Sequence, residues 1–204
     1  LTDKDLTGLL NMGGTILGTS REKPFKKRTS SQNKPALMLK TIQEMQLDCL
    51  VCIGGNGTQK TANKLAQLGV NVVSIPKTID NDVWGTETSF GFDTAVTIAT
   101  EAIDRLHSTA SSHQRVMVIE VMGHKAGWIA LHSGMAGGGD RNLATRMGGY
   151  ATEMIATGQF GRMVALQGDK IGSIPLEEVA GKLKLVNEDH DLIIQGKRMG
   201  VCFG

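Results

Sequence analysis

The stretch from residue 48 to residue 82 constrains the fold of this chain more than any other. A short apolar run, Leu50 to Ile53, has the length of a buried strand, although a buried helix segment has the same pattern. A glycine-rich turn follows at 54–58, and apolar residues then recur at helical spacing from Gln59 until a glycine ends the pattern. A second apolar run, Val70 to Ile75, comes next. This order predicts one right-handed βαβ unit in a parallel sheet.

Parallel neighbouring strands place the loops that follow them at the same edge of the sheet, where such folds bind ligands. One of these loops is the turn that contains Gly55, Asn56, Gly57 and Thr58. Its backbone N–H groups, with the N-terminus of the next helix, can hold phosphate groups. The signal is moderate, because many turns between strand and helix carry glycine for geometry alone.

The second loop, PKTIDND, carries Asp80 and Asp82 on either side of Asn81. Phosphoryl transfer needs a base for the attacking hydroxyl and an anchor for magnesium, and carboxylates supply both. The alternative is an Asx-turn, in which the aspartates cap their own backbone. The loop taken by itself supports both interpretations equally.

A third loop is predicted at the same edge. Residues 92–107 have a helical apolar face, and Val116 to Val121 reads as another buried strand that ends in Met122, Gly123 and His124. The position of His124 makes it a candidate for contact with a sugar phosphate, whereas a lone histidine is usually a satisfied polar residue. Arg115 precedes the strand, so it lies at the opposite edge. If it binds a ligand, it reaches the site of a neighbouring subunit.

The alternation of strands and helices fails at the glycines before Asp140 and Arg141, where one predicted helix follows another with no strand between them. We expect a seam here, with a segment of the natural protein absent. The predicted organisation is therefore a larger α/β lobe, residues 1–140, and the remainder of a second lobe with the C-terminal region, residues 141–204. The fold class is α/β: doubly wound parallel sheets with helices on both faces, in two similar lobes with segments missing.

Composition narrows the function. The 204 residues carry a net charge of +2 and only 4% aromatic residues, which gives no reason to expect nucleic acid as a partner. No apolar stretch approaches the length of a membrane span, so no membrane partner is expected. Cys49 and Cys52 have CxxC spacing but lie in or beside the predicted buried strand, which favours a structural role. The cytoplasm is the expected compartment.

With these pieces in place, the chain resembles the 6-phosphofructokinase family from Met12 to Gln167. The matching stretches are GGTILGTSR, GGNGT, PKTIDND, EAIDRLHSTASSHQR, VMGHKAG and RMGGYATEMIATGQFGRMVALQ. The resemblance implies a magnesium-dependent glycolytic enzyme, a homodimer or homotetramer. It implies phosphoryl transfer to the 1-hydroxyl of fructose 6-phosphate, which gives fructose 1,6-bisphosphate.

The resemblance also assigns roles. Asp80 would be the base on the sugar hydroxyl, and Asp82 would help to hold Mg²⁺. The substrate-binding residues would be Thr78, Ile79, Asp80, Arg115, Met122, Gly123 and His124, with Arg115 reaching an adjoining subunit. The residues that bind ATP or pyrophosphate would be Arg21, Glu22, Gly55, Asn56, Gly57, Thr58 and Lys77. From its own segment alone, Arg21 reads as a phosphate contact or, more simply, as a solvated surface arginine.

Four departures from the family pattern stand out. The family's first glycine-rich phosphate loop and its middle sugar-phosphate segment are absent from the sequence, and we expect both to be missing pieces. Asn56 replaces the usual aspartate, which makes it a weak metal ligand. His124 replaces the usual arginine, which gives a shorter side chain that is mostly neutral at pH 7.

The phosphoryl donor stays open between two molecules. Gly57 resembles the members that use ATP, because a residue without a side chain leaves room for the nucleotide. Lys77 resembles the members that use pyrophosphate, but some members that use ATP also carry this lysine. Gly57 is the better discriminator and favours ATP.

Two other functions are weaker alternatives. The GGNGT turn alone would also suit an NAD or lipid kinase, a class without the TIDND loop or the SSHQR segment. Asn56 and His124 would suit a catalytically silent, nucleotide-sensing subunit, against which the presence of Asp80 argues.

Overall fold

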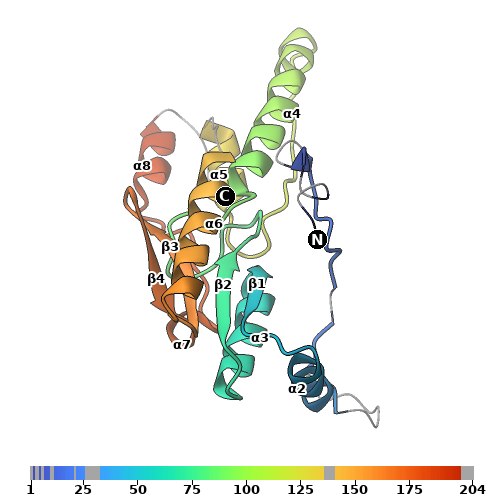
Figure 1. Ribbon diagram of the computed structural model, residues 1–204. Coiled ribbons are helices and arrows are strands. Elements are labelled where there is room, and N and C mark those ends of the chain that lie inside the picture. The colour runs from blue at the N-terminus through green and yellow to red at the C-terminus, as the bar shows by residue number, and fades with distance from the viewer. Residues whose placement is uncertain are drawn as a thin grey trace.

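The computed structural model describes residues 2, 5, 7–9, 12–20, 22–25, 33–135 and 141–198. The helices and strands follow one another along these residues as Figure 1 shows. They are α2 (Lys34–Glu44), β1 (Leu50–Gly54), α3 (Asn56–Gln67), β2 (Val72–Pro76), α4 (Phe92–Ser112), α5 (Trp128–Met135), α6 (Arg141–Ala156), β3 (Arg162–Gln167), β4 (Lys170–Pro175), α7 (Leu176–Val179) and α8 (Asp191–Arg198).

The four strands form one sheet in the order β1-β2-β3-β4. Strands β1 and β2 are parallel in a register that runs from Leu50 opposite Val72 to Gly54 opposite Pro76, which confirms the predicted βαβ unit. Strand β3 is parallel to β2, whereas β4 returns beside β3 in the antiparallel direction. The sheet is therefore mixed rather than wholly parallel. A two-residue turn at Gly168 and Asp169 makes the short β3–β4 hairpin possible.

Helices cover both faces of the sheet, and two apolar clusters hold them there (Figure 1). On one face, Ala62 and Leu65 of α3 pack with Val72 and Met163. On the other face, the buried side chains of α6 pack with Val73, Ile75 and Val164; they are Leu143, Met147, Ala151 and Met154. Successive residues of β2 thus point to opposite faces, as the two-residue period of a strand requires. The predicted α/β class with helices on both faces is confirmed.

The predicted boundary between lobes falls at 140/141. Strand β2 lies before that boundary and β3 after it, and the two pair in one sheet. The division into two lobes stays a prediction.

A third apolar cluster lies beyond the sheet, where α4 and α5 pack together. Phe92 and Val96 of α4 contact Trp128, Ile129 and Leu131 of α5, and all five side chains are buried. The N-terminal half of α4 is therefore anchored, while its C-terminal end projects away from the body of the molecule (Figure 1).

The predicted buried strand at residues 116–121 is not formed. The backbone there follows α4 without a strand partner, and the side chains of Val116 and Val118 are 94% and 95% exposed. A strand needs a neighbouring segment to satisfy its backbone hydrogen bonds, and no described segment pairs with residues 116–121. The apolar pattern indicated what this segment would do beside such a partner.

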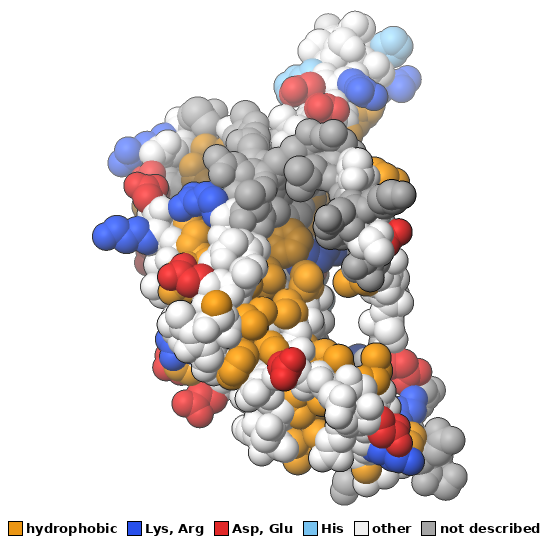
Figure 2. Space-filling model, in the orientation of Figure 1, with side chains coloured by type: hydrophobic (Ala, Val, Ile, Leu, Met, Phe, Trp, Pro, Cys, Tyr) orange, Lys and Arg blue, Asp and Glu red, His pale blue; other side chains and the backbone are white. Residues whose placement is uncertain are grey.

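One face of β1 is also left uncovered. Val51 and Ile53 are 41% and 50% exposed, whereas Leu50 and Cys52 on the opposite side of the strand pack against the α3 cluster. Hydrophobic side chains consequently gather on the visible surface beside α6 and over β1 (Figure 2). Among the helices of the described chain, none is long and apolar enough to cross a membrane.

Candidate functional site

The glycine-rich turn and the PKTIDND loop meet at the carboxyl edge of β1 and β2, as predicted. The backbone N–H of Lys77 donates to the carbonyl oxygen of Gly54 at 3.1 Å. A Cβ placed on Gly55 would lie 3.3 Å from the Cβ of Thr78, which is tighter than an ordinary contact. The absence of a side chain at Gly55 therefore lets the two loops lie against each other.

Helix α3 begins earlier than predicted. Gly55 is its N-cap, and Asn56, Gly57 and Thr58 form its first turn instead of an extended loop. The first N–H groups of a helix have no partner within the helix and carry the positive end of its dipole. This location suits an anion such as a phosphate group.

Open space lies outside that first turn. A Cβ on Gly57 would meet nothing within 4 Å. Gly57 lines a cavity of about 310 Å³ whose other walls are Lys23, Phe25, Lys60, Thr61 and Lys64. The Lys64 ammonium lies 5.2 Å from the centre of the Phe25 ring, which brings the N-terminal segment onto α3. Sequence reasoning missed these residues, although the spacing of Lys60 and Lys64 places both on one helical face.

Buried Asn81 organises the PKTIDND loop. Its backbone has a φ of +51°, a conformation that asparagine tolerates better than most residues. Its side-chain amide donates to the carbonyl of Glu87 at 3.1 Å and accepts from the backbone N–H of Ser89 at 2.9 Å. The hydroxyl of Ser89 in turn donates to the carbonyl of Thr78 at 2.9 Å. These bonds fix the backbone on both sides of Asn81 and hence the positions of Asp80 and Asp82.

Asp80 is half-buried beside Asp82. Burial raises the pKa of the Asp80 carboxyl, and the negative charge of Asp82 raises it further. His124 and the hydroxyl of Thr78 act in the opposite direction on the same pKa. The hydroxyl of Thr78 also accepts from the backbone N–H of Asp80 at 3.2 Å. Asp80 thus has the surroundings of a functional carboxylate, because the protein shifts its proton affinity without neutralising it in an ion pair.

Asp82 joins three of the predicted site segments. Its carboxylate oxygen Oδ2 lies 3.3 Å from Nδ1 of His124, and its backbone carbonyl accepts from the side-chain amide of Asn56 at 3.1 Å. The side chain of Asp82 is 6% exposed and that of His124 is 54% exposed. His124 has a φ of +53° directly after Gly123, whose φ is +152°. This tight turn brings the histidine back to the aspartate.

The donor groups suit a hard cation such as Mg²⁺. The amide oxygen Oδ1 of Asn56 is buried without a hydrogen-bond partner, beside the backbone of Asp82. The described residues contain no group of three or more His, Cys, Asp or Glu side chains placed to hold a metal. Mg²⁺ in phosphoryl-transfer enzymes is usually held by one or two carboxylates together with substrate phosphates. Asp82 with the oxygen of Asn56 fits that pattern.

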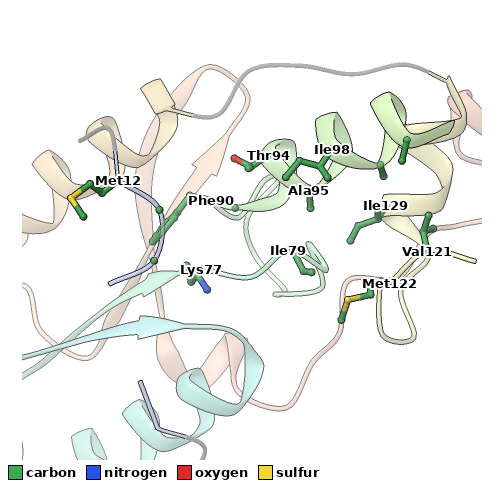
Figure 3. A pocket seen from close by; sticks show the side chains of 15 residues that line it. Met12, Lys77, Ile79, Phe90, Thr94, Ala95, Ile98, Val121, Met122 and Ile129 are labelled. Atoms are coloured by element: carbon green, nitrogen blue, oxygen red, sulfur yellow. The ribbon is translucent and has the colours of Figure 1, made fainter. Parts of the chain in front are cut away.

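A second cavity, of about 660 Å³, opens between the PKTIDND loop, α4 and the segment before α5 (Figure 3). It brings together three predicted site residues, Lys77, Ile79 and Met122, which come from two separate loops. Lys77 is the one charged side chain among the described residues that line it, and most of the wall is apolar.

The remaining predicted residues lie farther out. Glu22 is exposed and pairs with Lys34 of α2 at 2.6 Å. Arg115 is exposed and follows α4, whose C-terminal end projects away from the body of the molecule (Figure 1). Arg21 lies outside the described residues.

Comparisons with known proteins place these features in a family. The family model described as "Phosphofructokinase" matches residues 1–157. The "ATP-dependent 6-phosphofructokinase 3" of Bacteroides thetaiotaomicron is 57% identical over all of this chain and 84% of its own length. The "ATP-dependent 6-phosphofructokinase" of Spirochaeta thermophila is 39% identical over all of this chain and 84% of its own length.

Solved structures agree in fold. The pyrophosphate-dependent phosphofructokinase of Marinobacter aquaeolei superposes with a TM-score of 0.77 at 19% identity, over 94% of this chain and 73% of that one. The Pichia pastoris phosphofructokinase in the T-state gives a TM-score of 0.78 at 22% identity, over 88% of this chain and 30% of that one.

The alignment with the Bacteroides relative extends over 284 positions, 80 more than the 204 residues of this chain. At least that many positions therefore have a residue in the relative and none here, which agrees with the expectation of missing segments. The glycines before the expected seam lie outside the described residues. The family model matches residues 1–157, and the two relatives match this chain over its whole length. This chain therefore belongs to the phosphofructokinase family.

Proposed function

We propose that this protein transfers the terminal phosphoryl group of ATP to the 1-hydroxyl of fructose 6-phosphate. The proposal rests on family membership and on the loop that holds Asp80 and Asp82 against the N-terminus of α3. The relatives are named for this activity with ATP, and the arrangement of carboxylates and phosphate-binding backbone is what the reaction needs.

In the proposed step, the Asp80 carboxylate takes the proton of the sugar hydroxyl as that oxygen forms a bond to the γ-phosphorus. The bond from the γ-phosphorus to the bridging oxygen breaks, and ADP leaves with that oxygen. Burial and the charge of Asp82 raise the pKa of Asp80, which increases the affinity of its carboxylate for the proton that it takes. Thr78 holds the Asp80 backbone in place for this role.

Mg²⁺ would be held by Asp82 and the buried amide oxygen of Asn56, and it would neutralise charge on the phosphate chain. The α3 N-terminus at Gly55–Thr58 would bind the phosphates, between Asn56 and the cavity that Gly57 lines.

One observation favours ATP over pyrophosphate: the space at Gly57. A larger donor needs room beyond the β-phosphate, and Gly57 opens onto the cavity lined by Phe25, Lys60 and Lys64. An aromatic ring in a cavity lined by three lysines suits a nucleoside triphosphate, whereas pyrophosphate has no part that would fill this space. Lys77 would then add positive charge beside the phosphates in either case.

The sugar-phosphate half of the site would include Thr78, Ile79, Met122, Gly123 and His124. The exposed position of Arg115 at the end of α4 supports its role in the site of an adjoining subunit, and with it a homodimer or homotetramer. We also propose that the protein is located in the cytoplasm.

The test is initial-rate turnover of fructose 6-phosphate with ATP and with pyrophosphate in parallel, at fixed Mg²⁺. Turnover with ATP alone is the expected result. Turnover with pyrophosphate alone would reverse the assignment of the donor. Calorimetric titration with each substrate separately covers the third case: nucleotide binding without turnover would identify a silent, nucleotide-sensing subunit.

A further inference from the structure

Lys184 lies far from the predicted site in sequence but contacts the loop between β2 and α4, which carries Asp80 and Asp82, at several points. Its backbone N–H donates to the carbonyl of Asp82 at 3.1 Å. The preceding residue, Leu183, pairs with Val83 as an isolated antiparallel bridge. The chain after α7 therefore runs alongside the loop that carries Asp80 and Asp82.

The ammonium group of Lys184 binds the far side of the same loop. Nζ donates to the carbonyl of Thr86 at 3.1 Å and makes a short hydrogen bond to the carbonyl of Glu87. The carbonyl of Glu87 also accepts from the side-chain amide of Asn81. The carbonyl oxygen of Glu87 thus accepts hydrogen bonds from both the ammonium group of Lys184 and the side-chain amide of Asn81.

Lys184 also contacts Trp128 of α5. Nζ lies 5.0 Å from the centre of the Trp128 ring, and the indole N–H of Trp128 donates to the carbonyl of Lys184 at 2.8 Å. Trp128 is itself buried in the cluster of α4 and α5. Lys184 therefore connects the loop that carries Asp80 and Asp82 to the buried cluster between α4 and α5.

Burying the ammonium group of Lys184 costs free energy, because the charged group loses part of its hydration. Burial lowers the pKa of Lys184 to about 8, and the carboxylate of Glu87 compensates only in part. An apolar residue could fill the same place without that penalty. Its three N–H donors are matched instead to two carbonyls of one loop and to a ring face, which is the arrangement that holds a backbone in position.

We propose that Lys184 is a positioning residue for phosphoryl transfer, holding the loop that carries Asp80 and Asp82 in its reactive geometry. This inference rests on the proposed function. Lys184 does not touch substrate in it; it acts through Asn81 and the backbone of Asp82. Displacing a catalytic group by about 1 Å can reduce a rate on the order of 10²-fold, so loss of this anchor should appear in kcat.

The experiment compares Lys184→Met with Lys184→Arg and with the control Lys182→Met. Lys182 is exposed two residues away, and its ammonium faces the Trp84 ring rather than the loop carbonyls. We expect Lys184→Met to lower kcat on the order of 10²-fold, with the KM for ATP little changed. Lys184→Arg, which keeps a cationic donor, should recover part of the loss, and Lys182→Met should leave kcat unchanged.

A merely structural role would lower the melting temperature while the folded fraction kept its kcat, and that result overturns the proposal. A change confined to the KM for ATP overturns it as well. If Lys184→Met does not fold, Lys184→Gln takes its place, and a wild-type kcat in that variant has the same meaning.

The wild-type protein distinguishes failure of the proposed function from failure of the Lys184 proposal: if the proposed function is wrong, the wild type shows no turnover with either donor. In that case amide hydrogen exchange over residues 80–89 decides whether Lys184 holds the loop. Faster exchange in Lys184→Met than in Lys182→Met supports the anchor, and equal exchange in the two variants rejects it.

Discussion

The carboxylate oxygen Oδ2 of Asp82 and the ring nitrogen Nδ1 of His124 lie 3.3 Å apart, where the loop after β2 meets the turn before α5. The aspartate is buried and the histidine is half-exposed. This contact joins a residue proposed to hold Mg²⁺ to one proposed to face the sugar phosphate. It also sets the electrostatic surroundings of Asp80, whose pKa is raised by burial and by Asp82 and lowered by His124.

Replacing His124 by asparagine should therefore move the acid side of the pH–rate profile. The variant loses one of the two groups that oppose the rise in the pKa of Asp80, so this pKa increases further. The base then becomes protonated at a higher pH, and kcat/KM begins to fall at a higher pH on acidification. The measurement is kcat/KM for fructose 6-phosphate across the acid range. His107→Asn, on the exposed part of α4, serves as the control, and an identical profile in both variants would contradict the assignment.

Replacing Asp80 by asparagine should remove the base and leave the fold intact. General acid–base catalysis contributes about 10²- to 10⁴-fold, so kcat should fall within that range while fructose 6-phosphate binding persists. The matched control is Asp169→Asn, an exposed aspartate in the β3–β4 turn. Unchanged turnover in Asp80→Asn would mean that another group takes the proton.

Substituting Gly57 tests the donor. A side chain at this position meets no neighbour, and an aspartate in the first turn of α3 is favoured by the helix dipole, so the melting temperature should not fall. The added carboxylate nevertheless repels a nucleotide beside it, so the KM for ATP should rise about tenfold or more for a loss of roughly 1.4 kcal/mol or more in binding. Gly57→Ala separates charge from bulk, because it adds a methyl group and no charge. Equal KM values for ATP in wild type and Gly57→Asp would contradict the proposal that the nucleotide binds in the cavity beside Gly57.

The part of the site that could be predicted from sequence is the part encoded locally. The strands around Gly55 and Lys77 have the lengths, glycines and proline of a βαβ unit, and parallel pairing then brings their loops together without further information. Asn81 was expected only as a spacer between two aspartates. Its role in organising the loop depends on Glu87 and Ser89, which no simple periodicity relates to it.

Contacts between distant segments could not be predicted. Lys184 lies 97 and 98 residues from the two carbonyls that its ammonium binds, and nothing in its own neighbourhood indicates them. The segment with Val116 and Val118 shows the opposite problem. Its pattern is that of a buried strand, but a strand forms only beside a partner, and periodicity does not reveal whether the partner is present.

Asn56 provides a test for the metal that does not depend on turnover. Its side-chain amide donates to the carbonyl of Asp82, while its Oδ1 has no partner. The variant Asn56→Asp loses the donor and places a second carboxylate near Asp82, so its melting temperature without Mg²⁺ should be lower than that of the wild type. A carboxylate is also a stronger ligand for Mg²⁺ than an amide oxygen, and a ligand that binds only the folded state stabilises it. Added Mg²⁺ should therefore raise the melting temperature of Asn56→Asp more than that of the wild type. Asn63→Asp, on the same helix two turns from the site, is the control, and equal Mg²⁺ responses in the two variants would rule out Asn56 as a metal ligand.

The lowered pKa of Lys184 predicts how stability depends on alkaline pH. The unfolded chain keeps a proton on this lysine up to its ordinary pKa of 10.5, whereas the folded protein releases it near pH 8. Between these values the unfolded state binds more protons, so the free energy of unfolding gains a contribution that increases with pH. Lys184→Met lacks this contribution. Urea unfolding of wild type and variant at several pH values from 8 to 10.5 should show the difference in free energy of unfolding shifting in favour of the wild type as pH rises. Lys182→Met should follow the wild type across the same range, and parallel curves for wild type and Lys184→Met would show that the ammonium of Lys184 is not held in a desolvated place.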